Sequence, residues 1–307
     1  MIEVSRVSCE RGKTMNPCII TDQISQDFEF ALNAISEEGV HRIEIHSLWG
    51  KTIEELDDAT VEKVKNLMNF YGMSVTCLAS TLFMMLPLHD EDVLTDFSPT
   101  FKVIKGDLAT HMKYLQRAID IAHKLDCPRI RVFPFRAPEN RKMLGDKFDI
   151  EAMAILLTPA VRLAERENIT LVVENCPYSH LPKGKMTADL VKRIDSPNFK
   201  LLYDPANSYR ANIVRIPFRY LEGSLVEELR LILPWVDHLH IKDYHYVDGL
   251  TKPYLHVPLG KGEVPYAQLL RILHDNGYTG ALSCEPEVGF EGTMESLNTL
   301  RKLLRTL

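Results

Sequence analysis

The sequence lacks the marks of a secreted, membrane-spanning or nucleic-acid-binding protein. Its six cysteines form no CxxC pair and several lie in apolar runs, so we expect them to be reduced core residues of a cytoplasmic protein. The chain does not open with a basic stretch followed by an apolar one, which predicts no signal peptide. No uncharged apolar run approaches the ~18 residues of a membrane span. A formal net charge of −6 gives no long-range attraction to nucleic acid phosphates.

The chain offers instead a regular alternation of short β-rich apolar runs and amphipathic stretches of helix length. The predicted strands cover residues 42–46, 74–78, 129–134, 169–175, 200–204, 238–243 and 280–285, and either 2–7 or 18–21 supplies the eighth. The predicted helices cover residues 28–38, 53–71, 107–125, 149–168, 187–194, 225–233, 266–276 and 294–304.

Eight such alternations predict an α/β protein whose parallel sheet closes into a (β/α)8 TIM barrel. This architecture runs to ~250 residues as one unit, so we expect a single domain over residues 1–307 rather than two. An open, doubly wound sheet is the competing fold, but no GxGxxG follows the first strand to favour it. The long irregular stretches all follow strands, and in a barrel such connections lie on the catalytic face.

Four consecutive predicted strands end in polar side chains that an apolar strand would not choose for packing: Glu174, Asp204, His240 and Glu285. Each is separated from the next by one strand–helix unit and its loop, so we expect them to converge near the barrel mouth. Three carboxylates so placed repel one another unless a cation or a proton neutralises them. Carboxylate oxygens with one imidazole suit one divalent metal ion, namely Mn2+, Mg2+, Co2+ or Zn2+.

The motifs around these residues resemble those of the xylose isomerase-like barrel superfamily. They are VVEN (172–175), LYDPAN (202–207), HLHIKD (238–243) and LSCEP (282–286). Within the superfamily the chain is most similar to the sugar phosphate isomerase/epimerase group, which includes ketose 3-epimerases, hydroxypyruvate isomerase and inosose dehydratase. The first half of the chain resembles the group only in its strand–helix rhythm. The resemblance implies that Glu174, Asp204, His240 and Glu285 are metal ligands and that Glu174 and Glu285 are also the catalytic acid/base pair.

The chemistry agrees with this assignment. Removal of a proton beside a carbonyl needs a positioned base, and a metal bound to the substrate oxygens stabilises the enediolate. We therefore expect a metal-dependent isomerase or epimerase of a small sugar, sugar phosphate or polyol ketone, an enzyme of carbohydrate metabolism. An inosose-type or dehydroshikimate-type dehydratase and a catalytically idle sugar-binding barrel are the alternatives. The expected partner is the small-molecule substrate, with no nucleic acid and no membrane, and a homo-oligomer is compatible with this reading.

Five further residues are predicted to contact the substrate. Asn207 stands three residues after Asp204, where ketose 3-epimerases commonly have a histidine. His256 lies in a run, HVPLGKGE, that resembles the family's loop after the seventh strand. Lys242 shares a strand face with His240, and Glu44 is expected to point inward from the second strand, with an internal salt bridge as its alternative role. Arg136, just past the fourth strand, is placed to take a carboxylate or phosphate, with a solvated surface position as the alternative.

Endonuclease IV-type DNA repair enzymes share the barrel but need extra histidines on earlier strands for three zinc ions. The third and fourth predicted strands end without one, so we expect no trinuclear site. The remaining histidines are predicted to be surface residues of helices or loops, namely His41, His89, His111, His123 and His274.

Overall fold

In a computed structural model of the chain, the described residues, 15–98 and 100–307, contain a closed barrel of eight parallel strands. Around the barrel the order is β1 (Asn16–Ile20), β2 (Arg42–Ile45), β5 (Ser74–Leu82), β6 (Arg129–Val132), β7 (Thr170–Glu174), β8 (Phe199–Tyr203), β9 (Val236–Ile241) and β12 (Ala281–Cys284). Strand β12 pairs with β1 and closes the ring. The predicted α/β barrel is confirmed. Of the two candidates for the first strand, residues 18–21 overlap β1, and residues 2–7 lie outside the described residues.

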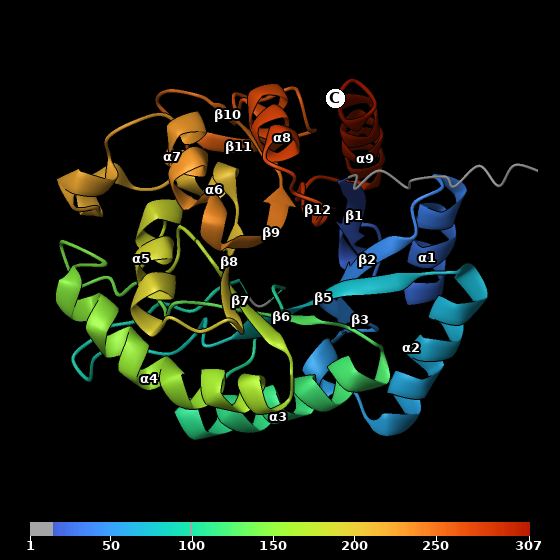
Figure 1. Cartoon of the computed structure of the whole chain (residues 1–307), viewed down its shortest axis with the longest axis horizontal. Coiled ribbons are helices and arrows are strands. Elements are labelled where there is room, and N and C mark those ends of the chain that lie inside the picture. The colour runs from blue at the N-terminus through green and yellow to red at the C-terminus, as the bar shows by residue number, and fades with distance from the viewer. Residues whose placement is uncertain (1–14, 99) are drawn as a thin grey trace, which may run out of the picture.

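Helices follow the barrel strands and pack around the outside of the ring (Figure 1). They are α1 (Phe28–Glu37), α2 (Asp58–Tyr71), α3 (Leu108–Lys124), α4 (Lys147–Arg166), α5 (Gly184–Ile194), the short α6 (Pro205–Tyr209), α7 (Leu225–Ile232), α8 (Tyr266–Asp275) and α9 (Phe290–Leu304). The α2 helix begins at residue 58 rather than at the predicted 53, because the Asp57 side chain accepts the N–H of Thr60 and caps the helix there.

Two small antiparallel sheets lie outside the ring. Strands β3 (Ser47–Leu48) and β4 (Lys51–Thr52) pair just after β2, and β10 (Asp243–Tyr246) pairs with β11 (Tyr254–Val257) just after β9. The second pair falls within a stretch predicted to be irregular, so the connection after β9 is a hairpin. Both pairs follow barrel strands and therefore stand at the same end of the barrel as the polar strand ends.

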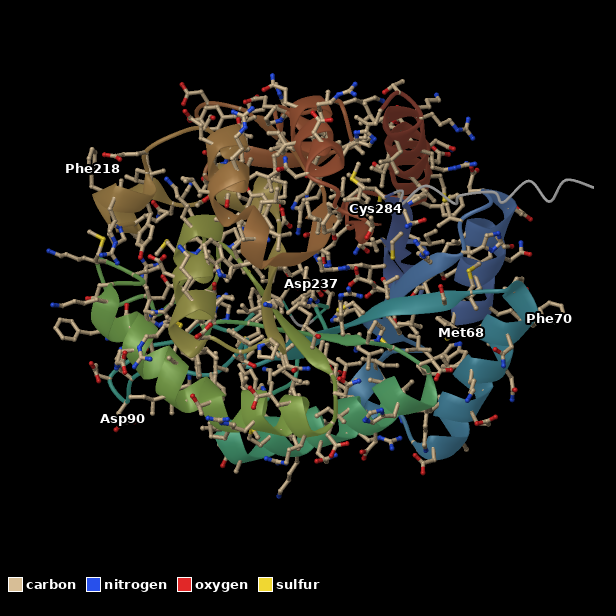
Figure 2. The ribbon with its side chains drawn as sticks, in the orientation of Figure 1. Met68, Phe70, Asp90, Phe218, Asp237 and Cys284 are labelled. Carbon is tan, nitrogen blue, oxygen red and sulfur yellow. The ribbon has the colours of Figure 1, made fainter. Side chains whose placement is uncertain are left out.

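The core lies between the strands and the helices that surround them. Cys284, in the barrel wall, is buried, whereas Phe70 and Phe218 project from the outer surface (Figure 2). The five cysteines within the described residues are buried and form no disulfide, and Cys9 lies outside those residues. No helix of the described chain is both long enough and apolar enough to span a membrane.

The prediction that His111 is a surface residue is wrong. His111 is fully buried, and its Nδ1 accepts the backbone N–H of Phe83 at 2.9 Å. The helical period explains the position, because His111 stands four residues before Leu115 on the buried face of α3. Burial lowers the pKa of His111 to about 4, so the ring is neutral at neutral pH.

Candidate active site

The structure brings the four predicted metal ligands together at the carboxyl end of the barrel. Glu174 is the last residue of β7, Asp204 follows β8, His240 lies near the end of β9, and Glu285 follows β12. Each offers one ligand atom, and these atoms all lie within 4.8 Å of one another. The first three side chains are buried, whereas Glu285 is slightly exposed. The strand geometry produces this convergence, since parallel strands of a barrel end on one rim.

Two cations balance the three carboxylates. The Arg131 Nη1 on β6 lies 3.0 Å from the Glu174 Oε2 and 3.2 Å from the Glu285 Oε1. The Lys242 Nζ lies 3.1 Å from the Asp204 Oδ2 and 2.6 Å from the Glu285 Oε2. Charges this deeply buried are stable only when they are paired. Arg131 was not singled out from the sequence, although alternation along its strand places it inside the barrel.

The electrostatics of the cluster make its carboxyl groups unequal. Burial alone would raise the pKa of Glu285, but the cations of Lys242 and His240 hold it well below its usual range. Burial raises the pKa of Asp204 to about 6 despite the nearby Lys242, since the Glu174 carboxylate also disfavours its charge. Burial would lower the pKa of Arg131, yet the adjacent carboxylates raise it, so Arg131 stays charged.

The donor set fits a divalent metal ion. Carboxylate oxygens and an imidazole nitrogen are the ligands that such ions take in proteins. The Oδ2 of Asp204 is buried and accepts no hydrogen bond from the described residues, although Lys242 lies near it. A metal ion held among these four side chains would give that oxygen a ligand bond in addition to the nearby Lys242 ammonium.

Glu44 lies behind His240 rather than against the cavity described below. Its Oε2 lies 3.2 Å from the Nε2 of His240, and its Oε1 forms a short hydrogen bond with the Nε2 of His238. Burial would raise the pKa of Glu44, but the two histidines hold it far below its usual range. With Nε2 engaged, the Nδ1 of His240 faces Glu285 at 3.2 Å and Glu174 at 3.7 Å. Of the two roles expected for Glu44, the structure therefore shows the internal salt bridge, with His238 and His240, rather than a contact with the cavity.

His238 was missed by the sequence reasoning, although it shares a strand face with His240 by the two-residue period. Ligand atoms of Glu44, His238 and His240 also lie within 4.8 Å of one another. This second set shares His240 with the first, and its members are fully buried and paired with each other. We interpret it as the support of the first set, because metal-ligating histidines are commonly fixed by a carboxylate on their other nitrogen.

A cavity of about 500 Å³ opens beside the ligand cluster. Its wall includes Glu285, Arg131 and two of the predicted substrate contacts, Asn207 and Lys242. Asn207 is buried and donates from Nδ2 to the Glu174 Oε1 at 3.0 Å. The size and the mixed polar and aromatic lining suit a small polar molecule.

Besides Glu44, two more predicted substrate contacts are not among the described residues that line this cavity. The ring of His256, on β11, lies 4.5 Å from that of Tyr244, and its Nε2 is 3.4 Å from Glu287. The guanidinium of Arg136 lies over the Phe97 ring at 4.0 Å and donates to the carbonyl oxygens of neighbouring loops. Arg136 thus binds loop backbone, because an aromatic ring and carbonyl groups from distant segments meet around it.

The closed barrel and the carboxylate–imidazole cluster at its mouth define a TIM barrel protein with a candidate metal centre. Residues 32–303 match the family model described as Xylose isomerase-like TIM barrel, and the chain belongs to this family.

Named relatives extend this comparison. The chain is 25% identical over 205 residues to a human protein named putative hydroxypyruvate isomerase, a match that covers 64% of this chain and 67% of the human one. The IOLI protein, solved with a bound zinc atom, has a similar fold, with a TM-score of 0.71 and 15% identity over 95% of this chain and 99% of that one. A D-tagatose 3-epimerase-like protein has a TM-score of 0.68 and 18% identity, covering 95% of this chain and 98% of its own.

Proposed function

We propose that this protein is a divalent-metal-dependent isomerase or epimerase of a small sugar, sugar phosphate or polyol ketone. The observation that carries the proposal is the meeting of Glu174, Asp204, His240 and Glu285 within 4.8 Å beside a cavity of about 500 Å³. Membership of the xylose isomerase-like family and the similarity to a protein named for isomerisation of a hydroxy keto acid support the same class of reaction.

A metal ion bound by these four residues would supply Lewis-acid stabilisation of negative charge on the substrate oxygens. The chain's own residues would move the proton. Glu285 lines the cavity, so its carboxylate can reach a bound substrate and accept a proton from the carbon beside the carbonyl. Arg131 contacts both Glu174 and Glu285, so it fixes the two carboxylates relative to each other.

Glu174 is the second acid/base group of the proposal. It is held on both oxygens, since Asn207 donates to its Oε1 and Arg131 to its Oε2. Return of the proton to the opposite face of the same carbon gives epimerisation, and return to the neighbouring carbon gives isomerisation. Expulsion of a β-hydroxyl from the same enediolate would make the protein a dehydratase, so the product identifies the reaction.

The test is incorporation of solvent deuterium into candidate substrates with added Mn2+. Hydroxypyruvate, a set of ketoses and a set of inososes are incubated in D2O, and products are identified by NMR and mass spectrometry. We expect deuterium at the carbon beside the carbonyl of at least one compound, and no incorporation after the metal is removed with a chelator. Absence of exchange in every compound while Mn2+ is bound would rule out the proposed chemistry.

A further inference from the structure

Arg210 carries a positive charge into the cavity without a carboxylate partner. Its guanidinium lies between two tyrosine rings, at 4.8 Å from Tyr178 and 5.1 Å from Tyr244, and its Nη1 donates to the Tyr178 hydroxyl at 3.3 Å. Within the described residues no carboxylate oxygen lies within 4.0 Å of it, and its buried Nε has no hydrogen-bond partner. The Nε is too buried to meet a ligand, but the terminal N–H groups of this half-buried, cavity-lining guanidinium can donate to an acceptor.

The short helix α6 links Arg210 to the ligand cluster. Asp204 caps this helix through the N–H of Asn207, and Asn207 and Arg210 follow at intervals of three residues. Residues at this spacing lie on the same side of a helix. Asn207 contacts Glu174, and both Asn207 and Arg210 line the cavity. Arg210 therefore stands one helical turn from the ligand cluster along the same cavity wall.

Two lysines from other loops line the same cavity. Lys102 follows β5 and Lys252 lies between β10 and β11, and both side chains are exposed. In the described part of the chain neither has a carboxylate within 4.0 Å. The cavity-lining carboxylates, by contrast, are already paired: Asp22 with His46, and both Glu285 and Glu287 with Lys242. Arg210, Lys102 and Lys252 therefore add positive charge to the cavity lining that no carboxylate of the described residues neutralises.

We propose that Arg210, with Lys102 and Lys252, binds an anionic group of the substrate, a carboxylate or a phosphate ester. The planar guanidinium can donate two parallel hydrogen bonds to either group, and the two exposed lysines of the lining add positive charge. The inference rests on the proposed function in one respect. It assumes that the anionic group and the carbonyl group near the ligand cluster belong to the same substrate molecule. It narrows the substrate class to anionic compounds and disfavours neutral sugars.

Binding of three related compounds that cannot be enolised tests this anion subsite. Glycerate, glycerol 3-phosphate and glycerol share a three-carbon hydroxylated skeleton and differ in carrying a carboxylate, a phosphate or no charge. Calorimetry on the full chain should give at least one anion about tenfold or more tighter than glycerol, as charge-assisted hydrogen bonds typically provide. The stronger of the two anions identifies the group.

The substitution Arg210→Gln should remove this preference, whereas Arg166→Gln should leave it unchanged. Arg166 is an exposed arginine at the end of α4 that does not line the cavity, so the control loses the same charge elsewhere. Lys252→Gln, at an exposed position where folding is not at risk, should weaken anion binding by a smaller factor. An equal preference in Arg210→Gln and Arg166→Gln, or no preference in the unmodified protein, would overturn the inference. Because none of these compounds reacts, the outcome is independent of the deuterium-exchange test of the proposed function.

Discussion

The two halves of the barrel contribute differently to the candidate metal centre. Strands β7, β8, β9 and β12, from the second half, carry all four grouped ligands at their ends. The first half supplies supporting groups only: Glu44 on β2 engages His240, and Arg131 on β6 bridges Glu174 and Glu285. Lys242 and Asn207 of the second half add further support. The comparison teaches that the residues expected to bind the metal and the residues that hold them in place can come from different strands. The strands of the second half present all four grouped residues, and the first half contributes only to fixing their charge and orientation.

The largest expected effect comes from altering the second half. Replacing Glu174 or Glu285 by Gln keeps the size and an oxygen atom but removes the base. We expect turnover to fall by ~100-fold or more in each variant, as is typical of losing a general base. The two should differ in solvent exchange, with the variant that keeps the first base still incorporating deuterium. Wild-type turnover in both variants with metal bound would mean that the carboxylates are ligands only.

A smaller effect is expected from the first half, through Glu44. The substitution Glu44→Gln leaves the four ligands in place but removes the charge that holds His240 and His238. Metal affinity should fall by about 10–100-fold, the range for groups that support a ligand, as measured by Mn2+ titration. Glu54→Gln is the matched control, because Glu54 is also a buried carboxyl group of the first half but forms no ion pair with either histidine. Equal metal affinity in the two variants would contradict the role of Glu44 as a group that supports the ligand His240.

The smallest expected effect concerns the pH dependence of stability and the buried His111. Its folded pKa, about 4, lies below the ordinary value of 6.5, so the folded state resists protonation. Stability linked to this group is therefore complete above about pH 6.5 and is lost as the pH falls toward 4. The substitution His111→Asn keeps a hydrogen-bond acceptor near the position of Nδ1 and removes the group that titrates. Between about pH 7 and pH 5.5 the free energy of unfolding of the wild type should decline by about 1 kcal/mol more than that of the variant. Parallel pH profiles in denaturant titrations would contradict the assignment.

The sequence predicted the barrel and the four grouped residues because both depend on local pattern. A carboxylate such as Glu174 or Asp204 is conspicuous at the end of an otherwise apolar strand. The alternation of strands and helices along the chain is enough to give the strand order. The support of the site depends on distant partners, and these partners were not predicted, although an internal salt bridge was one of the two roles considered for Glu44. Glu44 meets His238 only after the barrel closes. Arg136 was assigned to the substrate, yet the ring of Phe97 from another loop takes its guanidinium. Helices and strands can be predicted from repeating apolar patterns, but the conformation of a loop produces no such pattern in the sequence.

The most direct test of the metal centre is equilibrium dialysis of Mn2+ against the wild type and three variants. Asp204→Ala and His240→Ala each remove one grouped ligand, and Glu287→Gln removes a cavity-lining carboxylate that stands outside the group. We predict one ion per chain in the wild type and in Glu287→Gln. In the two ligand variants we predict a loss of affinity greater than the ~10–100-fold typical of supporting groups. Wild-type occupancy in both Asp204→Ala and His240→Ala would contradict the assignment of this cluster as a metal centre.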